Sequence, residues 1–376
     1  MKKSIAFLAS AALLAACQPA QKTGTVSGTL TGVENDTLLV TSIPMDGGKG
    51  RTMEKDTLIM QNGAFTFQAA CDTVPYQIIM QTPQSNNNYL RLVLLPGESL
   101  QVSGTMTDYQ VEGSAFNTAL QEVLATLWPY EQKLDSLSQI LTRLDEEQGE
   151  GAKEEIEKIY NESYRPVIQQ MMDTRLSYVK QHPDSDVSLY LLSQAGLDNL
   201  RELLPTLTDQ VKNGPLAPLY RTFEKAIQEA DAREAAKEKI KEGLPAPDFT
   251  LKDLQGNDLS LASLRSKYVV LDFWGSWCGW CIKGIPDMKK YYEKYKAKME
   301  ILGIDCRDTE EKWRAAVEKY ELPWLHVRNE GDPDVSILYA IQGYPTKIVV
   351  DPEGKIAKVV VGEDPAFYEY LDSLFK

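Results

Sequence analysis

The pattern of apolar and polar positions divides most of the chain into three regions. In residues 25–113 the two kinds of side chain alternate in short runs, such as "NGAFTFQAA" and "LRLVLLPGESLQVSGTM", which glycine, asparagine and proline interrupt. Alternation with period two is typical of strands that have one buried face, and the interrupting residues are those that form turns. The pattern predicts an antiparallel β-sandwich-like domain at the N-terminus.

A helical pattern follows in residues 114–242. Leucine, isoleucine, methionine and tyrosine recur there at intervals of three and four residues, which indicates amphipathic helices. Ser114 is placed to cap the first helix, and "GLPAP" from Gly243 ends the region. Two interpretations of this central α-helical region remain open. It is either a spacer whose apolar stripes pack together, or a surface that binds a client protein.

Strands alternate with helices in residues 243–376. The runs "KYVVLDFW" and "MEILGID" read as buried strands, "DTEEKWRAAVEKY" reads as a helix, and "TKIVVD" with "KIAKVVV" reads as a hairpin before a last helix. This order predicts a C-terminal α/β domain with a mixed sheet. The fold class expected for the whole chain is therefore multi-domain.

The first residues have the form of an export signal. Lys2 and Lys3 precede an apolar run that is too short to span a bilayer. The sequence "LAAC", which ends at Cys17, resembles the lipobox of bacterial lipoproteins. That resemblance implies removal of the signal peptide 1–16, a lipid anchor on Cys17 and a polar tether over 17–24. The alternative is an ordinary secretory signal that contains a cysteine by chance.

Composition excludes several classes of function. A formal charge of −14 argues against a nucleic-acid partner, because phosphate groups would be repelled. Cys278 and Cys281 are the one Cys-x-x-Cys pair, and two histidines in all are too few to complete a zinc site, so no metal is expected. No flavin or nicotinamide motif is visible, and no such cofactor is expected. Cys71 and Cys306 are expected to be small core residues, and His326 to lie in an edge strand.

The segment "WGSWCGWC" places Cys278 where a strand ends and a helix begins. Amide groups at a helix start favour a thiolate and should lower the pKa of the Cys278 thiol, whereas Cys281 lies in the first turn with less help. Asp272 stands six residues before Cys278 in an otherwise apolar strand, where burial should raise its pKa. The alternative is that strand twist turns Asp272 to solvent.

Two stretches carry a family resemblance. "VVLDFWGSWCGWC" resembles the active-site strand and turn of thioredoxin, and "APDFTLKDLQGNDLSLASLRSKYVVLDFWGSWC" resembles the TlpA/ResA-like branch of exported thiol–disulfide oxidoreductases. The likeness covers residues 243–376. It implies a thioredoxin-like fold and a dithiol/disulfide cycle of Cys278 and Cys281, with Cys278 as the nucleophile and Cys281 as the resolving thiol.

The same resemblance implies roles for other residues. Asp272 would transfer protons at Cys281, and Pro345 in "GYPTK" would be the cis-proline that faces the cysteine pair. Substrate binding would fall to the backbone around that proline and to exposed aromatic rings. The residues expected to bind substrate are Trp277, Trp280, Tyr344, Pro345 and Thr346.

The chain departs at three places from the family that it resembles. Gly279-Trp280 stands between the cysteines, where relatives have a dipeptide that contains proline. Gly284 occupies a place where exported relatives commonly carry glutamate, and Asp272 one where they often have asparagine. The pH behaviour of the relatives therefore cannot be carried over to this chain.

The function expected from these observations is a membrane-anchored thiol–disulfide oxidoreductase that reduces disulfide-containing client proteins, with an upstream thiol electron donor. The expected location is the cell envelope of a Gram-negative bacterium, facing the periplasm. Residue 18 is not aspartate, which favours the outer membrane. The alternatives are a binding or scaffold lipoprotein with a redox-responsive domain, and a disulfide oxidase or isomerase.

The stretch "LVLLPGESLQVSGTMTDYQVEGSAFN" resembles the N-terminal domain of many thioredoxin-like lipoproteins. The role of that domain is unsettled, so this resemblance informs the architecture more than the function.

Overall fold

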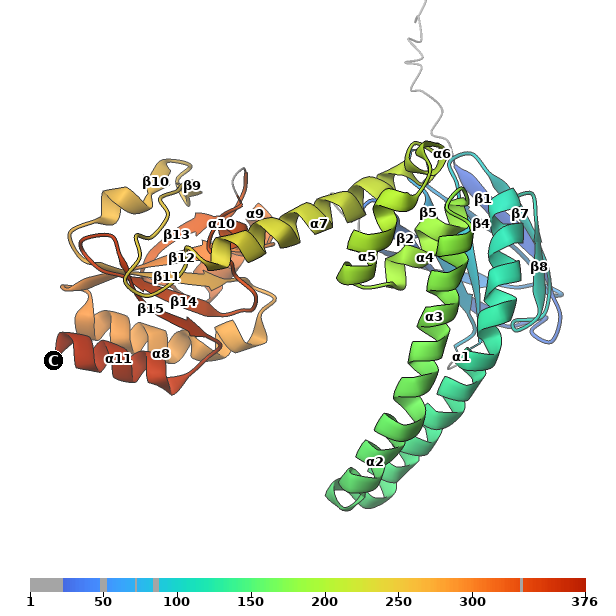
Figure 1. Cartoon of the computed structure of the whole chain (residues 1–376), viewed down its shortest axis with the longest axis horizontal. Helices are drawn as coiled ribbons and strands as arrows, with labels where there is room; N and C mark the ends of the chain where they lie inside the picture. Colours follow the sequence, from blue (N-terminus) through green and yellow to red (C-terminus); the bar gives the residue numbers. More distant parts are fainter. Residues whose placement is uncertain (1–22, 48–52, 72, 84–87, 332–333) are drawn as a thin grey trace, which may run out of the picture. The chain divides into compact units, whose positions relative to one another are not determined.

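A computed structural model describes residues 23–47, 53–71, 73–83, 88–331 and 334–376. The chain divides into two compact units, residues 1–225 and 226–376 (Figure 1). The predicted signal peptide, Cys17 and most of the tether lie outside the described residues. Within the described part, no helix is both long enough and apolar enough to cross a membrane.

The first unit begins with a β-sandwich of two four-stranded sheets, in the orders β4-β1-β7-β8 and β3-β2-β5-β6. Buried and exposed positions alternate along β2 and β4, so that each sheet presents one apolar face to the common core. Strand β1 runs parallel to β7, so the sandwich is not wholly antiparallel as expected. The strands are β1 (Gly24–Leu30), β2 (Thr37–Pro44), β3 (Glu54–Ile59), β4 (Ala64–Ala69), β5 (Tyr76–Gln81), β6 (Tyr89–Leu94), β7 (Ser99–Gly104) and β8 (Tyr109–Glu112).

Helices complete this unit. Ser114 caps α1, because its Oγ accepts a hydrogen bond from the backbone N–H of Asn117. The buried Asn117 amide also bonds both backbone groups of Val93, which fixes α1 to strand β6. Figure 1 shows α1 and α3 as long neighbours. The helices are α1 (Ala115–Gln148), α2 (Lys153–Ile159), a π-helical turn (Tyr160–Tyr164), α3 (Arg165–Gln181), α4 (Asp186–Leu191), α5 (Leu197–Leu203), α6 (Asp209–Lys212) and α7 (Ala217–Lys237), which crosses into the second unit.

The second unit is built on a seven-stranded mixed sheet in the order β10-β9-β13-β12-β11-β14-β15. β11 runs parallel to β12 and antiparallel to β14, which confirms the predicted α/β domain. His326 lies in β13 between β9 and β12, so the edge-strand expectation is wrong. The strands are β9 (Thr250–Asp253), β10 (Asp258–Ser260), β11 (Tyr268–Trp274), β12 (Met299–Asp305), β13 (Leu325–Arg328), β14 (Thr346–Val350) and β15 (Ile356–Val361), and the helices are α8 (Gly279–Tyr295), α9 (Glu310–Lys319), α10 (Val335–Leu338) and α11 (Pro365–Phe375).

Strand β11 connects two hydrophobic cores. Val269, Leu271 and Phe273 belong to one core, while Val270 and Trp274 belong to another that residues of α8, α9 and α11 complete. Asp272 lies between Val270 and Trp274 in the alternation, so its side chain points to the face that α8 covers. The buried carboxylate of Asp272 therefore lies between the sheet and α8, the helix that starts at the cysteine pair.

Candidate functional site

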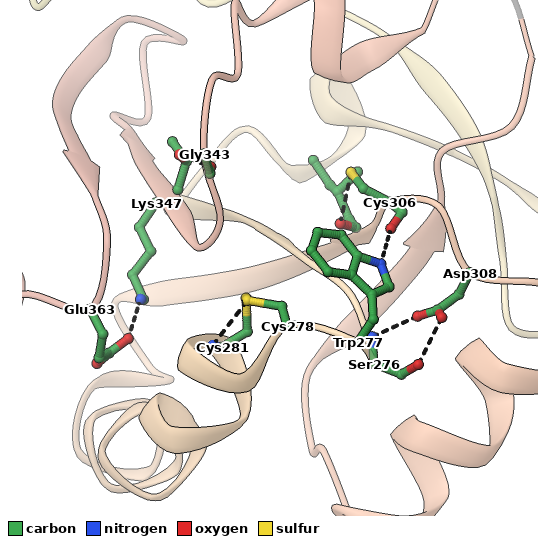
Figure 2. Close-up of a disulfide and its surroundings, with 11 residues drawn as sticks. Ser276, Trp277, Cys278, Cys281, Cys306, Asp308, Gly343, Lys347 and Glu363 are labelled. Atoms are coloured by element: carbon green, nitrogen blue, oxygen red, sulfur yellow. Dashed lines mark hydrogen bonds and ion pairs between the residues drawn. A yellow bond between two sulfur atoms is a disulfide. The ribbon is translucent and has the colours of Figure 1, made fainter. Parts of the chain in front are cut away.

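Cys278 and Cys281 form a disulfide at the start of α8 (Figure 2). Cys278 is the N-cap residue, and its Sγ accepts a hydrogen bond of 3.1 Å from the backbone N–H of Cys281. The first turn of α8 contains no acidic residue. The free amide groups of this helix end would therefore favour negative charge on Cys278 in the reduced protein. Cys278 is 5% exposed and Cys281 is 8% exposed.

Asp272 is buried in β11 with 8% of its surface exposed, so the strand does not turn it to solvent. Its Oδ1 has no hydrogen-bond partner among the described residues. Burial raises the pKa of Asp272 to about 6, because a desolvated carboxylate is less stable than the neutral acid. The charge of Lys347 opposes this rise and that of Glu363 adds to it.

Buried Lys347 and partly buried Glu363 form an ion pair beside the disulfide (Figure 2). Lys347 lies in β14 directly opposite Asp272, so the two side chains share a face of the sheet. Its Nζ is 2.7 Å from Glu363 Oε2, and the Tyr368 hydroxyl donates a hydrogen bond of 2.6 Å to Glu363 Oε1. The sequence prediction missed both residues. A lone lysine inside the apolar run "TKIVV" was a signal of the same kind as Asp272 in its own strand.

Gly284 makes room for this pair. It is buried in α8, and a Cβ atom at this position would collide with the carboxyl group of Glu363. The carboxylate of Glu363 thus lies where a side chain of residue 284 would begin. The departure from the family at Gly284 therefore coincides with an acid that reaches the same space from the segment after β15.

A cavity of about 10 Å³ links these groups to one of the two cysteines. Its walls include Asp272, Cys281, Pro345, Lys347 and Glu363, and Cys278 is not among the lining residues. This volume is on the order of that needed for one water molecule. Asp272 and Cys281 therefore share one small cavity, while Cys278 caps the start of α8.

The surface beside the disulfide is aromatic. Trp277 is 47% exposed and Trp280 is 62% exposed, and the Trp277 ring contacts that of Tyr344 edge-on at 5.2 Å between centroids. The Tyr344–Pro345 peptide bond is cis. Thr346, by contrast, is buried, and its hydroxyl donates a hydrogen bond to the Gly343 carbonyl, so its side chain does not reach this surface.

Hydrogen bonds join the loop that carries Trp277 to the loop after β12. The Trp277 Nε1 donates a hydrogen bond of 2.9 Å to the Cys306 carbonyl, and the Asp308 carboxylate accepts bonds from the backbone N–H and hydroxyl of Ser276 (Figure 2). The loop after β12 is thereby fixed to the loop before α8. Asp308 was also missed from the sequence, because nothing local distinguishes it from other loop acids.

Cys71, Cys306 and His326 are all buried. Cys71 lies in the core of the β-sandwich and Cys306 in one core of the second unit, and burial raises the pKa of the Cys306 thiol to about 12. His326 packs between the rings of Trp274 and Trp324, and burial lowers its pKa to about 3, so it is neutral. Among the described ranges, no group of three or more histidine, cysteine or acidic residues is arranged to hold a metal ion.

A central β-strand that leads into a helix capped by a cystine, with a cis-proline beside it, defines a thioredoxin-like redox domain. Residues 243–359 match the model of the AhpC/TSA family, and residues 24–120 match a domain of unknown function, DUF4369. The chain is 36% identical over 130 residues to the thiol-disulfide oxidoreductase ResA of a Bacillus cereus strain, covering 34% of this chain and 75% of that protein.

A second curated relative matches the same part of the chain. The ResA protein of Bacillus subtilis (strain 168) is 35% identical over 141 residues, which cover 37% of this chain and 78% of that protein. The solved thioredoxin domain of a thiol-disulfide oxidoreductase from Bacteroides vulgatus is 35% identical, with a TM-score of 0.34, and covers 36% of this chain and 99% of that chain. The chain belongs to the family of ResA-like thiol–disulfide oxidoreductases.

The buried carboxylate leads to a prediction about stability. Because the pKa of Asp272 is higher in the folded protein than in the unfolded chain, protonation favours folding, and the free energy of unfolding falls as pH rises from 3.8 through about 6. Asp272→Asn removes this penalty and should raise the free energy of unfolding at pH 7 by up to about 3 kcal/mol. Urea unfolding of the oxidised natural protein and of the oxidised variant, at pH 7 and at pH 3, measures this gain in the free energy of unfolding. An equal gain at both pH values would contradict the account.

The space shared by Gly284 and Glu363 leads to a second prediction. Glu363→Ala leaves Lys347 buried without its counterion and should cost about 3–5 kcal/mol. In the Gly284→Glu, Glu363→Ala double variant, the new carboxylate starts from the vacated space and can pair with Lys347. Most of the loss should then be recovered. Urea unfolding of both single variants and the double variant forms a cycle, and simple addition of the two single effects would count against this arrangement.

Proposed function

We propose that this oxidoreductase reduces disulfides of client proteins in the cell envelope through a cycle of Cys278 and Cys281. The observation that carries the proposal is the asymmetry of the pair. Cys278 caps the helix that favours its thiolate, and Cys281 shares a small cavity with the buried acid Asp272. One thiol is therefore arranged to attack and the other to lose a proton later.

The cycle begins with attack of the Cys278 thiolate on one sulfur of a client disulfide. A Cys278–client disulfide forms, and the second client sulfur leaves as a thiolate that takes a proton from solvent. The Cys281 thiol then gives its proton to the Asp272 carboxylate, directly or through one water in the cavity. The Cys281 thiolate attacks Cys278 Sγ, the client's first sulfur leaves as a thiolate, and the protein is left with the Cys278–Cys281 disulfide.

Electron balance requires a donor. Each turn transfers two electrons from the protein dithiol to the client, so an upstream thiol donor must reduce the Cys278–Cys281 disulfide again. At pH 7 the Asp272 carboxylate is mostly ionised, because its pKa is about 6, and it can accept the proton of Cys281. The resolving step should therefore become faster as pH rises through about 6.

Client binding is assigned to the exposed surface around Pro345. An extended client segment would lie along the backbone of Tyr344 and Pro345, in the manner of an added strand. The exposed rings of Trp277 and Trp280 would contact its side chains. The hydroxyl of Thr346 would keep the turn in shape through its bond to Gly343 rather than touch the client.

Anchoring is proposed from the sequence, since Cys17 lies outside the described residues. A lipid on Cys17 would hold the domain in the envelope, facing the periplasm, with the outer membrane as the expected site. Membrane fractionation compares the natural protein with Cys17→Ser. The natural protein should sediment with membranes and the variant should be released, whereas membrane association of the variant would contradict the lipid anchor.

The catalytic assignment predicts distinct outcomes for the two cysteines. Cys278→Ser should abolish the dithiol-dependent reduction of insulin, because it removes the attacking sulfur. Cys281→Ser retains the attack and loses the resolving step, so it should accumulate mixed disulfides with clients, visible on non-reducing gels. Full insulin reduction by Cys278→Ser would contradict the assignment.

The direction of electron flow is tested by the reduction potential of the pair. A value near that of thioredoxin, roughly −270 mV, fits a reductase, whereas a value near roughly −120 mV would make the protein an oxidant and would replace the proposal by its oxidase alternative. Cys71→Ser is a suitable control for this titration, since that cysteine is buried in the other unit.

One observation favours the alternative of a binding protein. The first unit contains a cavity of about 470 Å³ between β6, β8 and α1, a size typical of small-ligand sites. Arg91 bonds the Tyr89 hydroxyl there and lies 3.7 Å from Glu131. If Arg91→Ala abolished a partner interaction that Cys278→Ser left intact, the binding function would be supported alongside the redox function.

A further inference from the structure

Two cations lie over the aromatic rings beside the disulfide. The Arg307 guanidinium is 5.8 Å from the ring centre of Trp277 and 5.5 Å from that of Tyr344. The Lys283 Nζ lies 4.7 Å from the ring centre of Trp280. Trp277 immediately precedes Cys278, and Trp280 follows it by two residues. The tryptophan on each side of this cysteine in the sequence therefore has a cationic side chain over its ring.

The backbone holds Arg307 in this position. Its φ of 74° lies in the left-handed region, which side chains other than glycine rarely adopt because the Cβ atom crowds the following carbonyl. The residues on both sides of it are fixed: the Cys306 backbone bonds Trp274 and Trp277, and Asp308 bonds Ser276. The loop therefore keeps an arginine in a conformation that suits glycine better, and this aims its side chain at the Trp277 and Tyr344 rings.

Among the residues that the structure describes, neither Arg307 nor Lys283 forms an ion pair. Two acidic residues near them in the chain or the fold have other partners: Asp308 accepts bonds from the backbone N–H and hydroxyl of Ser276, and Glu363 pairs with Lys347. Stacking over a ring leaves the N–H edge of a guanidinium free to bind a carboxylate. These local positive charges stand in a chain whose formal charge is −14.

We propose that Arg307 and Lys283 make this oxidoreductase select client segments that carry a glutamate or aspartate next to the reacting cysteine. The proposal rests on the proposed function and deepens it. A client extended along Tyr344 and Pro345 would place the neighbours of its cysteine near the Trp277 and Trp280 rings, where the two cations lie. Charges at the edge of a binding surface act mainly on the association rate and lose their effect as salt rises.

Disulfide-bonded peptides with one shared sequence test this selection, with Glu, Gln or Lys beside the cysteine. The readout is the second-order rate constant for their reduction by the dithiol form. At low salt we expect the Glu peptide to react about tenfold faster than the Lys peptide, with the Gln peptide between them. In Arg307→Gln, Lys283→Gln the ratio should fall below about twofold, and high salt should reduce it in the natural protein.

Two control variants distinguish loss of the positive charges from a general effect of the substitutions on the protein. Lys319→Gln removes a lysine that also lies over a ring, that of Tyr320 at 5.0 Å, at the end of α9 and away from the cysteine motif in sequence. It should keep the full preference, and Arg307→Lys should keep most of it. Equal rates for the three peptides with the natural protein, or an unchanged ratio in the double variant, would overturn the inference. Failure to reduce any of the peptides would instead overturn the proposed function.

Discussion

The burial of the Asp272 carboxylate behind the disulfide is the constraint on which the rest of this site depends. Two effects compete there. Removal from water raises the pKa of the acid, and the charge of Lys347 directly across the sheet lowers it. Burial prevails, because Lys347 is already bound to Glu363, and the pKa remains at about 6. A chain that only had to be stable would carry an apolar residue here, as it does at Val270 on the same face.

The ion pair of Lys347 and Glu363 shows that an acidic group can occupy the same space in the fold although it comes from a different place in the sequence. In the exported oxidoreductases that this chain resembles, the helix after the second cysteine commonly carries a glutamate. In this chain the corresponding residue is Gly284. The carboxylate of Glu363 nevertheless lies against Gly284, supported by Lys347 and the Tyr368 hydroxyl. An acid beside Cys281 is therefore a feature of this protein, although no reading of the helix alone would find it.

The sequence predicted those parts of the fold and site that depend on local pattern. The apolar run of β11, the helix start at Cys278 and the lone acid among apolar neighbours are all visible within one segment. Glu363 depends on the hairpin of β14 and β15, which brings a residue from far along the chain to α8. Arg307 depends on a left-handed turn that no pattern signals. The parallel pairing of β1 with β7 and the interior place of β13 likewise follow from tertiary packing, which a single strand's sequence does not record.

A direct test of the central claim is the titration of the Asp272 side-chain carboxyl carbon by NMR in the oxidised protein. Its signal is assigned by comparison with Asp272→Asn. Burial of the carboxylate in the cavity shared with Cys281 predicts a midpoint near pH 6. A midpoint near 3.8, the ordinary value for an aspartate, would show that the carboxylate is solvated and would contradict the account.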